Sequence, residues 1–376
     1  MKNLGTLYRF ELKKILKNRM TKVMLAILFA IAVLEAVVPA FSVTRDMREA
    51  RSKLDGRLID DALLNEMYPN IDTYGEKWNS DNQKYYGIAY VEQCSIAGDN
   101  PLADYSAEDI YNQREESILA YMEYRNMSDS DITWWQTTMQ KVKTPFRYVY
   151  AGGPLFLAQG LSTLLLILML LSALCLTTVF TIEHRQRTDQ ILLSSRNGRK
   201  ETYFIKICAG ISTIIMASFL AALILTILVF VIYGTAGFDG IIQLEVPLSP
   251  YPFTMGQFIL IQLIIMITAG ILYAVFAMAI SEFTKNSLAV MGIMVGLYLL
   301  GQIDFFTDKV QLLSQLKSLL PSNVIPVYSL MEYRLVHVGD GIFTIYAVAP
   351  VLYLVLSVML IIAGRFVYER FQVTGR

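Results

Sequence analysis

The chain has 376 residues, of which 55% are hydrophobic, and its mean hydropathy is +0.45. This composition excludes a soluble globular domain and is typical of a membrane protein that crosses the bilayer several times. The formal net charge is zero, and the chain has only three cysteines and two histidines, with no HExxH or CxxC motif, so a metal-centred mechanism lacks ligands.

Residues 1–22 contain seven basic residues and one acid, Glu11. Apolar side chains recur at helical spacing, at Leu4, Leu7, Tyr8, Leu12, Ile15 and Leu16, and basic side chains occupy the rest of the helix surface, at Arg9, Lys13, Lys14 and Lys17. This pattern predicts a helix that lies in the headgroup region of an anionic membrane leaflet. A basic flank that only sets the membrane orientation is the alternative.

The first apolar run, from Met20 to about Phe41, has the length that a bilayer core requires. The basic region before it is too long and too patterned for a signal peptide, so we interpret the run as a permanent span. Glu35 is the one acid within it and is therefore a possible pathway residue. Because Glu35 lies in the outer third, near Pro39, its side chain can instead reach the outer water.

The next segment, residues 42–152, differs sharply in composition, with many tyrosines, asparagines and acids. We predict a mainly helical extracytoplasmic domain with one helix from Asp46 to Glu66, a second opened by Ser106 and a third opened by Ser130, and an irregular stretch from Asn70 to Pro101. Its acidic and aromatic side chains could capture a cationic peptide, or could simply form a core and a solvated face. Cys94 has no second outer cysteine to pair with in this chain, so we expect a free or packed thiol.

Residues 153–376 contain five more apolar runs, which with the first make six predicted spans. We place them at residues 155–181, 204–233, 255–280, 287–303 and 345–364. With both termini inside, the cytoplasmic segments hold 17 Lys and Arg against 6 Asp and Glu, and the outer segments hold 15 against 25. Gly292 and Gly296 have the spacing that permits close helix contact, and we interpret them as internal packing residues.

The outer segment 304–344 is too polar to cross the membrane. Residues 307–320 have the spacing of an amphipathic helix, and Pro321 ends it. On sequence alone the helix can rest on the lipid surface or turn back into the membrane.

The polar loop 183–206 lies between two long apolar runs and is mostly basic. Thr188 can cap a helix, Asp189 suits its first turn, and Asn197-Gly198 can end it. The two turns so defined would expose an apolar patch formed by Ile191, Leu192 and Leu193. A helix this short needs a surface to lean on, unless the loop is only a solvated connector.

This loop resembles the cytoplasmic loop after the second span in ABC exporter permeases of the second export type. The resemblance is based on Glu183, Arg185, Arg187, Thr188, the run Ile191-Leu192-Leu193-Ser194, Arg199-Lys200 and Lys206. It implies an all-α membrane protein of six transmembrane helices, with an N-terminal interfacial elbow helix formed by Leu7, Arg9, Lys13, Lys14 and Lys17. In that family short outer helices before the last span close the outer mouth of the pathway. The resemblance also implies a coupling helix that docks on a separate ATPase, through Glu183, Arg187, Thr188, Asp189, Ile191, Leu192, Leu193 and Arg199.

The chain has no GxxxxGK[ST] motif and no GxSxG motif, so we expect no ATP binding and no catalytic residue in it. The resemblance implies ATP and Mg²⁺ on a cytoplasmic ATPase subunit, in two copies, together with a second permease copy or paralogue in a bacterial cytoplasmic membrane. The basic residues of the chain follow the predicted membrane edges, so we expect no nucleic acid partner. The alternative function is a sensor or scaffold that does not transport, whose outer domain binds a ligand or peptide.

Overall fold

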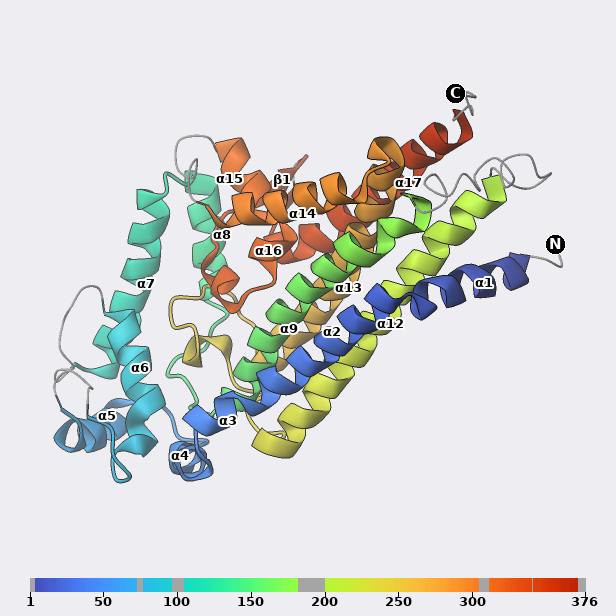
Figure 1. The fold of residues 1–376 in the computed structure, drawn as a ribbon. Coiled ribbons are helices and arrows are strands. Elements are labelled where there is room, and N and C mark those ends of the chain that lie inside the picture. The colour runs from blue at the N-terminus through green and yellow to red at the C-terminus, as the bar shows by residue number, and fades with distance from the viewer. Residues whose placement is uncertain are drawn as a thin grey trace.

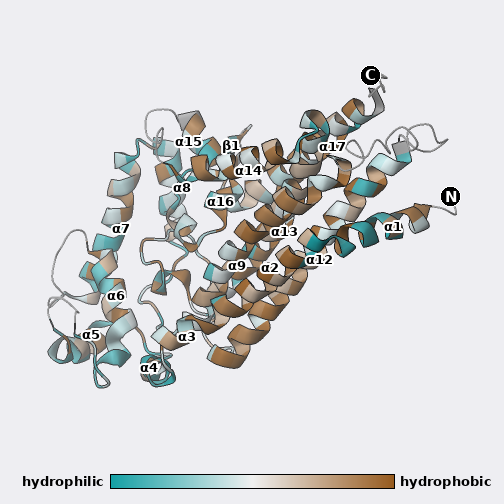
Figure 2. Cartoon of the chain, viewed as in Figure 1, coloured by the Kyte–Doolittle hydropathy of each residue, from teal (hydrophilic) through white to brown (hydrophobic). Residues whose placement is uncertain are grey.

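The computed structural model describes residues 4–72, 77–96, 105–181, 200–303, 311–339 and 341–370. Long helices form a bundle, and a second, smaller helical part lies beside one end of it (Figure 1). The bundle helices are predominantly hydrophobic along their length, while the first helix and the smaller part carry most of the polar surface (Figure 2). The segments that continue to both termini and to residues 182–199 leave from the opposite end of the bundle (Figure 1).

The N-terminal region is a helix, α1 (Leu4–Lys17), followed directly by the first long apolar helix, α2 (Arg19–Val37). The break falls at Asn18, whose side chain accepts a hydrogen bond from the Met20 amide and so caps the new helix. Pro39 then opens the short α3 (Pro39–Ser42). The helical periodicity expected at the N-terminus is therefore present as a separate helix.

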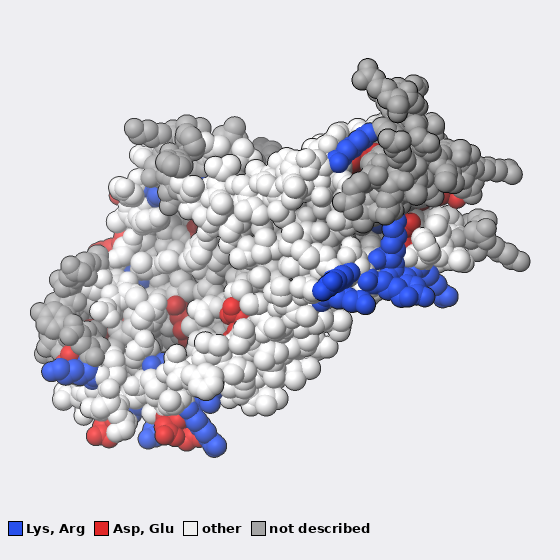
Figure 3. Space-filling view, viewed as in Figure 1, with Lys and Arg blue, Asp and Glu red and all other residues white. Residues whose placement is uncertain are grey.

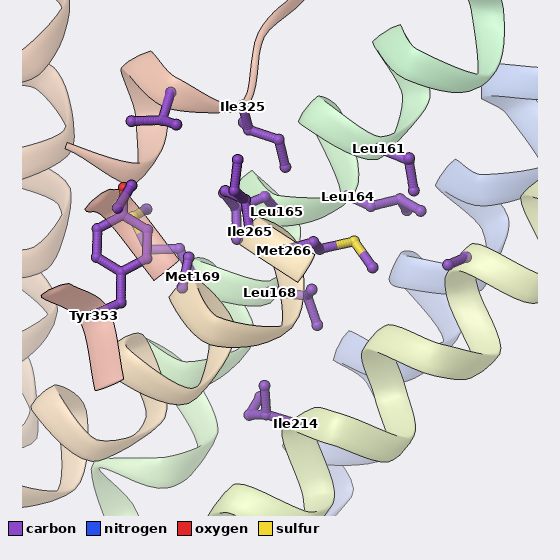
Figure 4. Packing of buried hydrophobic residues seen from close by; sticks show 14 of the residues in the cluster. Leu161, Leu164, Leu165, Leu168, Met169, Ile214, Ile265, Met266, Ile325 and Tyr353 are labelled. Atoms are coloured by element: carbon purple, nitrogen blue, oxygen red, sulfur yellow. The ribbon is translucent and has the colours of Figure 1, made fainter. Parts of the chain in front are cut away.

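The bundle consists of α2, α9 (Gly152–Leu171, continued by a π-helical turn at Ser172–Leu176), α12 (Lys200–Tyr233), α13 (Met255–Thr284), α14 (Ser287–Gln302) and α17 (Ile345–Arg370). Helix α13 is central and packs against α9, α12 and α17. Leucines of α9 meet Ile265 and Met266 of α13, Ile214 of α12 and Ile325 in one core (Figure 4). Close packing here fixes how the helices lie relative to one another.

Five helices among the described residues are long and apolar enough to span a membrane, namely Arg19–Ser42, Gly152–Thr181, Glu201–Tyr233, Met255–Thr284 and Ile345–Tyr368. The run expected as the fifth span forms α14, which has 16 residues. At 1.5 Å per residue it is about 24 Å long, below the roughly 30 Å of a bilayer core. The polytopic all-α fold is thus confirmed, whereas the count of six spans stays a prediction.

The turn between α13 and α14 is set by two adjacent residues. Lys285 adopts the left-handed conformation that ends α13, and the side chain of Asn286 accepts from the amides of Leu288 and Ala289 at the start of α14. Chain reversal within two residues keeps α14 beside α13. The interpretation of Gly292 and Gly296 as internal packing residues is wrong, because Val290 and Met294 fill the inward face and nothing lies within 4 Å of a Cβ built at either glycine.

The outer domain contains α4 (Arg45–Arg51), α5 (Asp61–Met67), α6 (Tyr86–Ser95), α7 (Ala107–Tyr124) and α8 (Asp129–Met139), with 3₁₀ turns at Ser52–Leu54, Tyr68–Asn70 and Gln83–Tyr85. The predicted single helix from Asp46 to Glu66 is wrong. Gly56 has a φ of +89° and Leu58 pairs with Arg147 as an isolated bridge, so the chain turns there. Helix α6 also lies inside the stretch predicted as irregular. Helix α7 does begin with a capping box between Ser106 and Asp109.

Two outer connections complete the fold and form what we call the outer cap. One is the loop 234–254, which contains the 3₁₀ turn Ile242–Leu244. The other comprises α15 (Gln311–Ser318), α16 (Pro321–Val324), a 3₁₀ turn at Val327–Met331 and an antiparallel hairpin of β1 (Val336–Val338) and β2 (Gly341–Phe343). Helix α15 lies within the predicted amphipathic helix.

The outer domain has a separate hydrophobic core only in its distal half, around Ile59, Leu63, Tyr85 and Phe146. The buried side chains of α8 and of the second half of α7, including Ile118 and Trp135, belong instead to the core that continues through the bundle. The domain is consequently packed against the outer cap rather than attached to the bundle by linkers alone.

Candidate functional site

The residues predicted for ATPase coupling lie outside the described residues, because Glu183, Arg187, Thr188, Asp189, Ile191, Leu192, Leu193 and Arg199 all fall in 182–199. The described ends of the two flanking helices, at Thr181 and Lys200, lie at the same end of the bundle as α1 and the end of α17 (Figure 1). We call that end of the bundle the basic end.

Helix α1 packs along α12 at the basic end. Its side chains Glu11 and Ile15 are buried, Leu7 and Lys14 are partly buried, and the other predicted elbow residues, Arg9, Lys13 and Lys17, are exposed. Lys and Arg side chains gather there on the molecular surface (Figure 3). The structure thus brings the predicted elbow residues together on one helix with a buried and a basic face, and its position in a membrane interface remains a prediction.

Lys206 is fully buried where α12 leaves the predicted loop. Its ammonium group donates to the carbonyl of Val179 over 3.4 Å and lies 5.2 Å from the centre of the Phe180 ring. A buried cation held this way links the first turns of α12 to the last turn of the apolar helix Gly152–Thr181. The sequence placed Lys206 in the loop and gave no sign of its burial.

Glu35, the possible pathway residue, is partly buried at the seam between α2, α9 and α12. A Cβ built on Gly160 of α9 would lie 3.2 Å from the Cβ of Glu35 in α2 and 2.7 Å from a methyl group of Leu225 in α12. Helix α9 therefore approaches both α2 and α12 closely at this glycine. The carboxylate does not line any of the cavities described below.

Part of the outer cap reaches to the middle of the apolar helices. The carbonyl of Ile325 accepts hydrogen bonds from Gln262 of α13 over 2.6 Å and from Ser162 of α9 over 3.2 Å. Ser162 is ten residues into α9, which corresponds to about 15 Å from its start. Irregular backbone at such a depth is tolerated where protein groups satisfy its polar atoms, and Gln262 and Ser162 do so here.

Three cavities run from the outer cap into the bundle. The outer cavity has a volume of about 400 Å³ and lies between the end of α7, the end of α14 and the outer cap. It is lined by cationic and phenolic side chains with one carboxylate, namely Arg125, Lys317, Arg334, Tyr121, Tyr328, Tyr333 and Glu332. The Glu332 carboxylate accepts from the Arg334 amide over 3.1 Å.

The middle cavity, of about 230 Å³, lies beside Ser162 and Thr163 of α9 and shares Gln302 and Tyr328 with the outer one. The third, of about 290 Å³, is lined mainly by leucine, methionine and phenylalanine side chains of α9, α13, α14, α16 and α17. It shares Tyr273, Tyr298 and Ser322 with the middle cavity. The three cavities together form what we call the cavity chain.

Sequence reasoning missed the cavity chain. A usable signal was present in the polar and phenolic residues inside apolar runs, because Gln262, Tyr273 and Tyr298 all lie in predicted spans. Their convergence on one place could not be inferred, since it depends on the deep position of residues 321–328.

Two charged groups, the buried Arg114 and the partly buried Glu245, shape the electrostatics of the outer cap. Arg114 of α7 is 2% exposed and donates to the carbonyls of Pro247 and Ser249, both over 2.6 Å. Burial lowers the pKa of its guanidinium to about 10. Burial also raises the pKa of Glu245 to about 7, against the opposing effect of Arg51. At neutral pH the guanidinium is charged and the carboxyl is poised between its two forms.

Five apolar helices that can span a bilayer, with irregular backbone held among them, indicate a polytopic membrane protein, and the three cavities lie between its helices and the outer cap. The sequence matches the family model described as ABC-2 family transporter protein over residues 6–372. The chain therefore belongs to the ABC-2 transporter family and has the family's permease domain, as the resemblance predicted. Neither the curated proteins nor the solved structures contained a match.

Proposed function

We propose that the chain is the permease subunit of an ATP-driven exporter, in which it forms half of the translocation pathway beside a second copy or a paralogue. A cytoplasmic ATPase, in two copies, binds ATP and Mg²⁺ and docks on the loop 183–206. The protein lies in a bacterial cytoplasmic membrane, with six spans and both termini in the cytoplasm. Membership of the permease family over residues 6–372 is the observation on which this proposal rests most.

The distribution of charge supports this orientation. At the basic end, exposed cations follow α1, which packs along α12 (Figure 3). Positive residues favour the cytoplasmic side of a span. The basic end is therefore the side on which an ATPase would dock.

The cavity chain supports an amphipathic cargo, such as an antimicrobial peptide or a drug. Its outer part offers charged and phenolic groups, and its inner part offers hydrocarbon. A compound with both kinds of surface can satisfy both parts at once.

The decisive experiment coexpresses the chain with the ABC ATPase encoded next to it and measures copurification and ATP hydrolysis in liposomes. The variant Leu192→Asp with Leu193→Asp removes apolar contact and adds charge that a docked helix would leave unpaired. We expect normal insertion and unchanged thermal stability of the permease alone, with loss of the ATPase and of transport.

A matched control places two aspartates at the opposite end, by Leu313→Asp and Leu316→Asp on the exposed face of α15. This control is expected to retain the ATPase. If the chain is instead a sensor or scaffold without an ATPase, the unmodified chain should not copurify with one. If the Leu192 and Leu193 variant still forms intact complexes with the ATPase, the docking role of the loop is excluded.

A further inference from the structure

Two tyrosines line both the middle cavity and the third cavity, which we call the apolar cavity. Tyr273 lies eleven residues before the end of α13 at Thr284, and Tyr298 lies eleven residues after the start of α14 at Ser287. At 1.5 Å per residue, each is about 16 Å from the turn between the two helices, which is near the middle of a bilayer core of roughly 30 Å. Both phenols therefore lie at the same depth, among apolar surroundings.

The hydroxyl groups of Tyr273 and Tyr298 make no hydrogen bond within the described part of the chain. Both side chains are partly buried, yet neither hydroxyl is among the fully enclosed side-chain atoms that lack a partner, so each reaches open space. The open space beside both residues is the pair of cavities that they line. A phenol without an acceptor is unfavourable in an apolar region, so a bound molecule that carries an acceptor would stabilise this arrangement.

The two cavities have the size and the lining of a site for a small lipophilic molecule. Their volumes of about 290 Å³ and 230 Å³ together fall in the range of pockets that bind small molecules. None of the described residues that line either cavity is charged, so an ionic ligand would lose its hydration there without gaining a charged partner. An acyl chain would fill the apolar cavity but would leave both phenols without an acceptor.

The apolar cavity opens toward the side of the bundle. Two of its lining residues, Leu297 of α14 and Leu356 of α17, are 47% and 37% exposed. The opening therefore lies between α14 and α17, at a face that is apolar. A molecule dissolved in the bilayer can enter there without passing through water.

We propose that the apolar and middle cavities bind a neutral lipophilic molecule with a hydrogen-bond acceptor, such as an aromatic ketone, whose acceptor is held by the hydroxyls of Tyr273 and Tyr298. The role of such a molecule as cargo rests on the transport function proposed above. Binding itself does not, because every residue involved belongs to this chain.

The test compares 9-fluorenone with fluorene, which share one ring skeleton and differ in a single carbonyl group. Equilibrium dialysis measures their binding to the isolated permease in maltoside micelles, and empty micelles give the partition into detergent. We expect saturable binding, roughly tenfold tighter for fluorenone, and a carbonyl infrared band of the bound ketone at the frequency of a hydrogen-bonded group. Equal affinities would indicate a site for hydrocarbon or acyl chains and would overturn the proposal, as would uptake no greater than that of empty micelles.

The phenols are tested by Tyr273→Phe with Tyr298→Phe. Because only the hydroxyls are removed, the affinity for fluorenone should fall to that for fluorene, the hydrogen-bonded carbonyl band should disappear, and fluorene binding should not change. The matched control is Tyr124→Phe, at a site in the outer domain that is 73% exposed, which should bind both compounds as the unmodified permease does. If the double variant keeps the hydrogen-bonded band, the phenols are not the donors and the proposal fails.

The opening is tested by Leu297→Trp, which places a large ring at the mouth of the apolar cavity. We expect binding of both compounds to weaken about equally. The control is Leu299→Trp on the same helix, because Leu299 is 54% exposed and does not line the cavity. Equal weakening in the two tryptophan variants would place the site elsewhere and overturn the proposal.

This measurement and the ATPase experiment fail separately. Because binding is measured on the isolated permease, failure of an ATPase to copurify would overturn the proposed function and leave the binding result standing. Saturable fluorenone binding that does not stimulate ATP hydrolysis by the assembled complex would contradict the role of such a molecule as cargo.

Discussion

The two ends of the helix bundle are stabilised in different ways. At the outer end, buried polar side chains donate to backbone carbonyls that are distant in sequence: Arg114 to Pro247 and Ser249, Trp135 to Tyr333, Tyr251 to Glu332 and Gln262 to Ile325. At the basic end, Tyr203 donates to Ile361 and Lys206 to Val179 in the same way, and helix α1 packs along α12 with Arg9, Lys13 and Lys17 exposed. The outer end therefore has more such bonds among the described residues, whereas the basic end also offers charge to a membrane or a partner.

This difference indicates where rigidity and where adjustment are expected. Buried hydrogen bonds from charged or amide groups strongly disfavour alternative arrangements, because breaking one leaves a carbonyl unsatisfied. Exposed charges at the basic end contribute little to the fold by themselves. The predictions below test this contrast, beginning with the bond whose loss should be most damaging.

The largest effect is expected at Arg114. Arg114→Met removes two charge-assisted hydrogen bonds and leaves the carbonyls of Pro247 and Ser249 without this donor, at a cost of roughly 3 kcal/mol. Thermal unfolding of the purified permease and protease sensitivity of the loop 234–254 would report it. The control is Arg45→Met, whose ion pair with Glu49 is exposed to solvent and should therefore contribute little to stability. Equal losses of thermal stability in the Arg114 and Arg45 variants would contradict the contrast between buried and exposed charge.

The second prediction concerns the depth of the outer cap. Gln262→Met keeps the side-chain length but removes the donors to the carbonyls of Ala158 and Ile325, which should cost about 1–3 kcal/mol. Cysteines introduced at Ser322 and Pro326 should then react faster with a water-soluble thiol reagent in the variant. Leu260→Met on the same helix is the control, because Leu260 is 61% exposed. Unchanged labelling would indicate that Gln262 does not anchor this segment.

The structural features that could be predicted from the sequence are those set by residues close together in the chain. The N-terminal helix, the capping box at Ser106 and the positions of the long apolar helices, to within about six residues at their ends, follow from local patterns, and the structure contains them. The single helix expected from Asp46 to Glu66 failed because one glycine with positive φ and one bridge to Arg147 outweigh helical periodicity. Long-range pairing of this kind has no local signal.

The candidate site shows the same limit. Gln262 lies in a predicted span, so its burial could have been suspected from its polarity. Arg114 lies in a predicted helix of the outer domain and Lys206 at the end of the predicted loop, and the sequence did not indicate that either is buried. Their acceptors are backbone carbonyls, which no sequence motif marks. The coupling role of the loop was inferred from family resemblance, and the residues predicted for coupling lie outside the described part of the chain.

The third prediction uses pH to compare two carboxyls of the outer side, Glu245 and Glu66. The pKa of Glu245 is raised to about 7 in the folded protein, with Arg51 opposing and Tyr90, Tyr148 and Tyr150 nearby. A raised carboxyl pKa favours folding below the unfolded value near 4.5, and this contribution is lost as pH rises to 7. Stability of the outer domain should therefore fall by roughly 1–2 kcal/mol between pH 5 and pH 8.

The variant Glu245→Gln should remove that part of the pH dependence and be more stable than the unmodified protein at pH 8. Glu66 provides a contrast, because hydrogen bonds from Arg57, Tyr85 and Lys84 lower its pKa to about 2. Its contribution is present above the ordinary carboxyl pKa and is lost only as pH falls toward 2, so Glu66→Gln should leave the slope between pH 5 and pH 8 unchanged. If Glu66→Gln removed the fall in stability between pH 5 and pH 8, that pH dependence would have been wrongly assigned to Glu245.

The smallest effect is expected at Glu35, the one acid of the first span. Its side chain lies at the seam of α2, α9 and α12, outside the lining of the cavity chain and near the outer end of its helix. Because its carboxylate takes part in none of the outer-cap bonds named above, Glu35→Gln should change thermal stability by less than about 0.5 kcal/mol and leave transport and ATP hydrolysis intact. Transport by reconstituted complexes, with Arg114→Met as the positive control for damage at the outer end, would measure this. Should Glu35→Gln abolish transport while the complex still assembles, the seam between α2 and α9, rather than the cavity chain, would become the candidate route for cargo or protons.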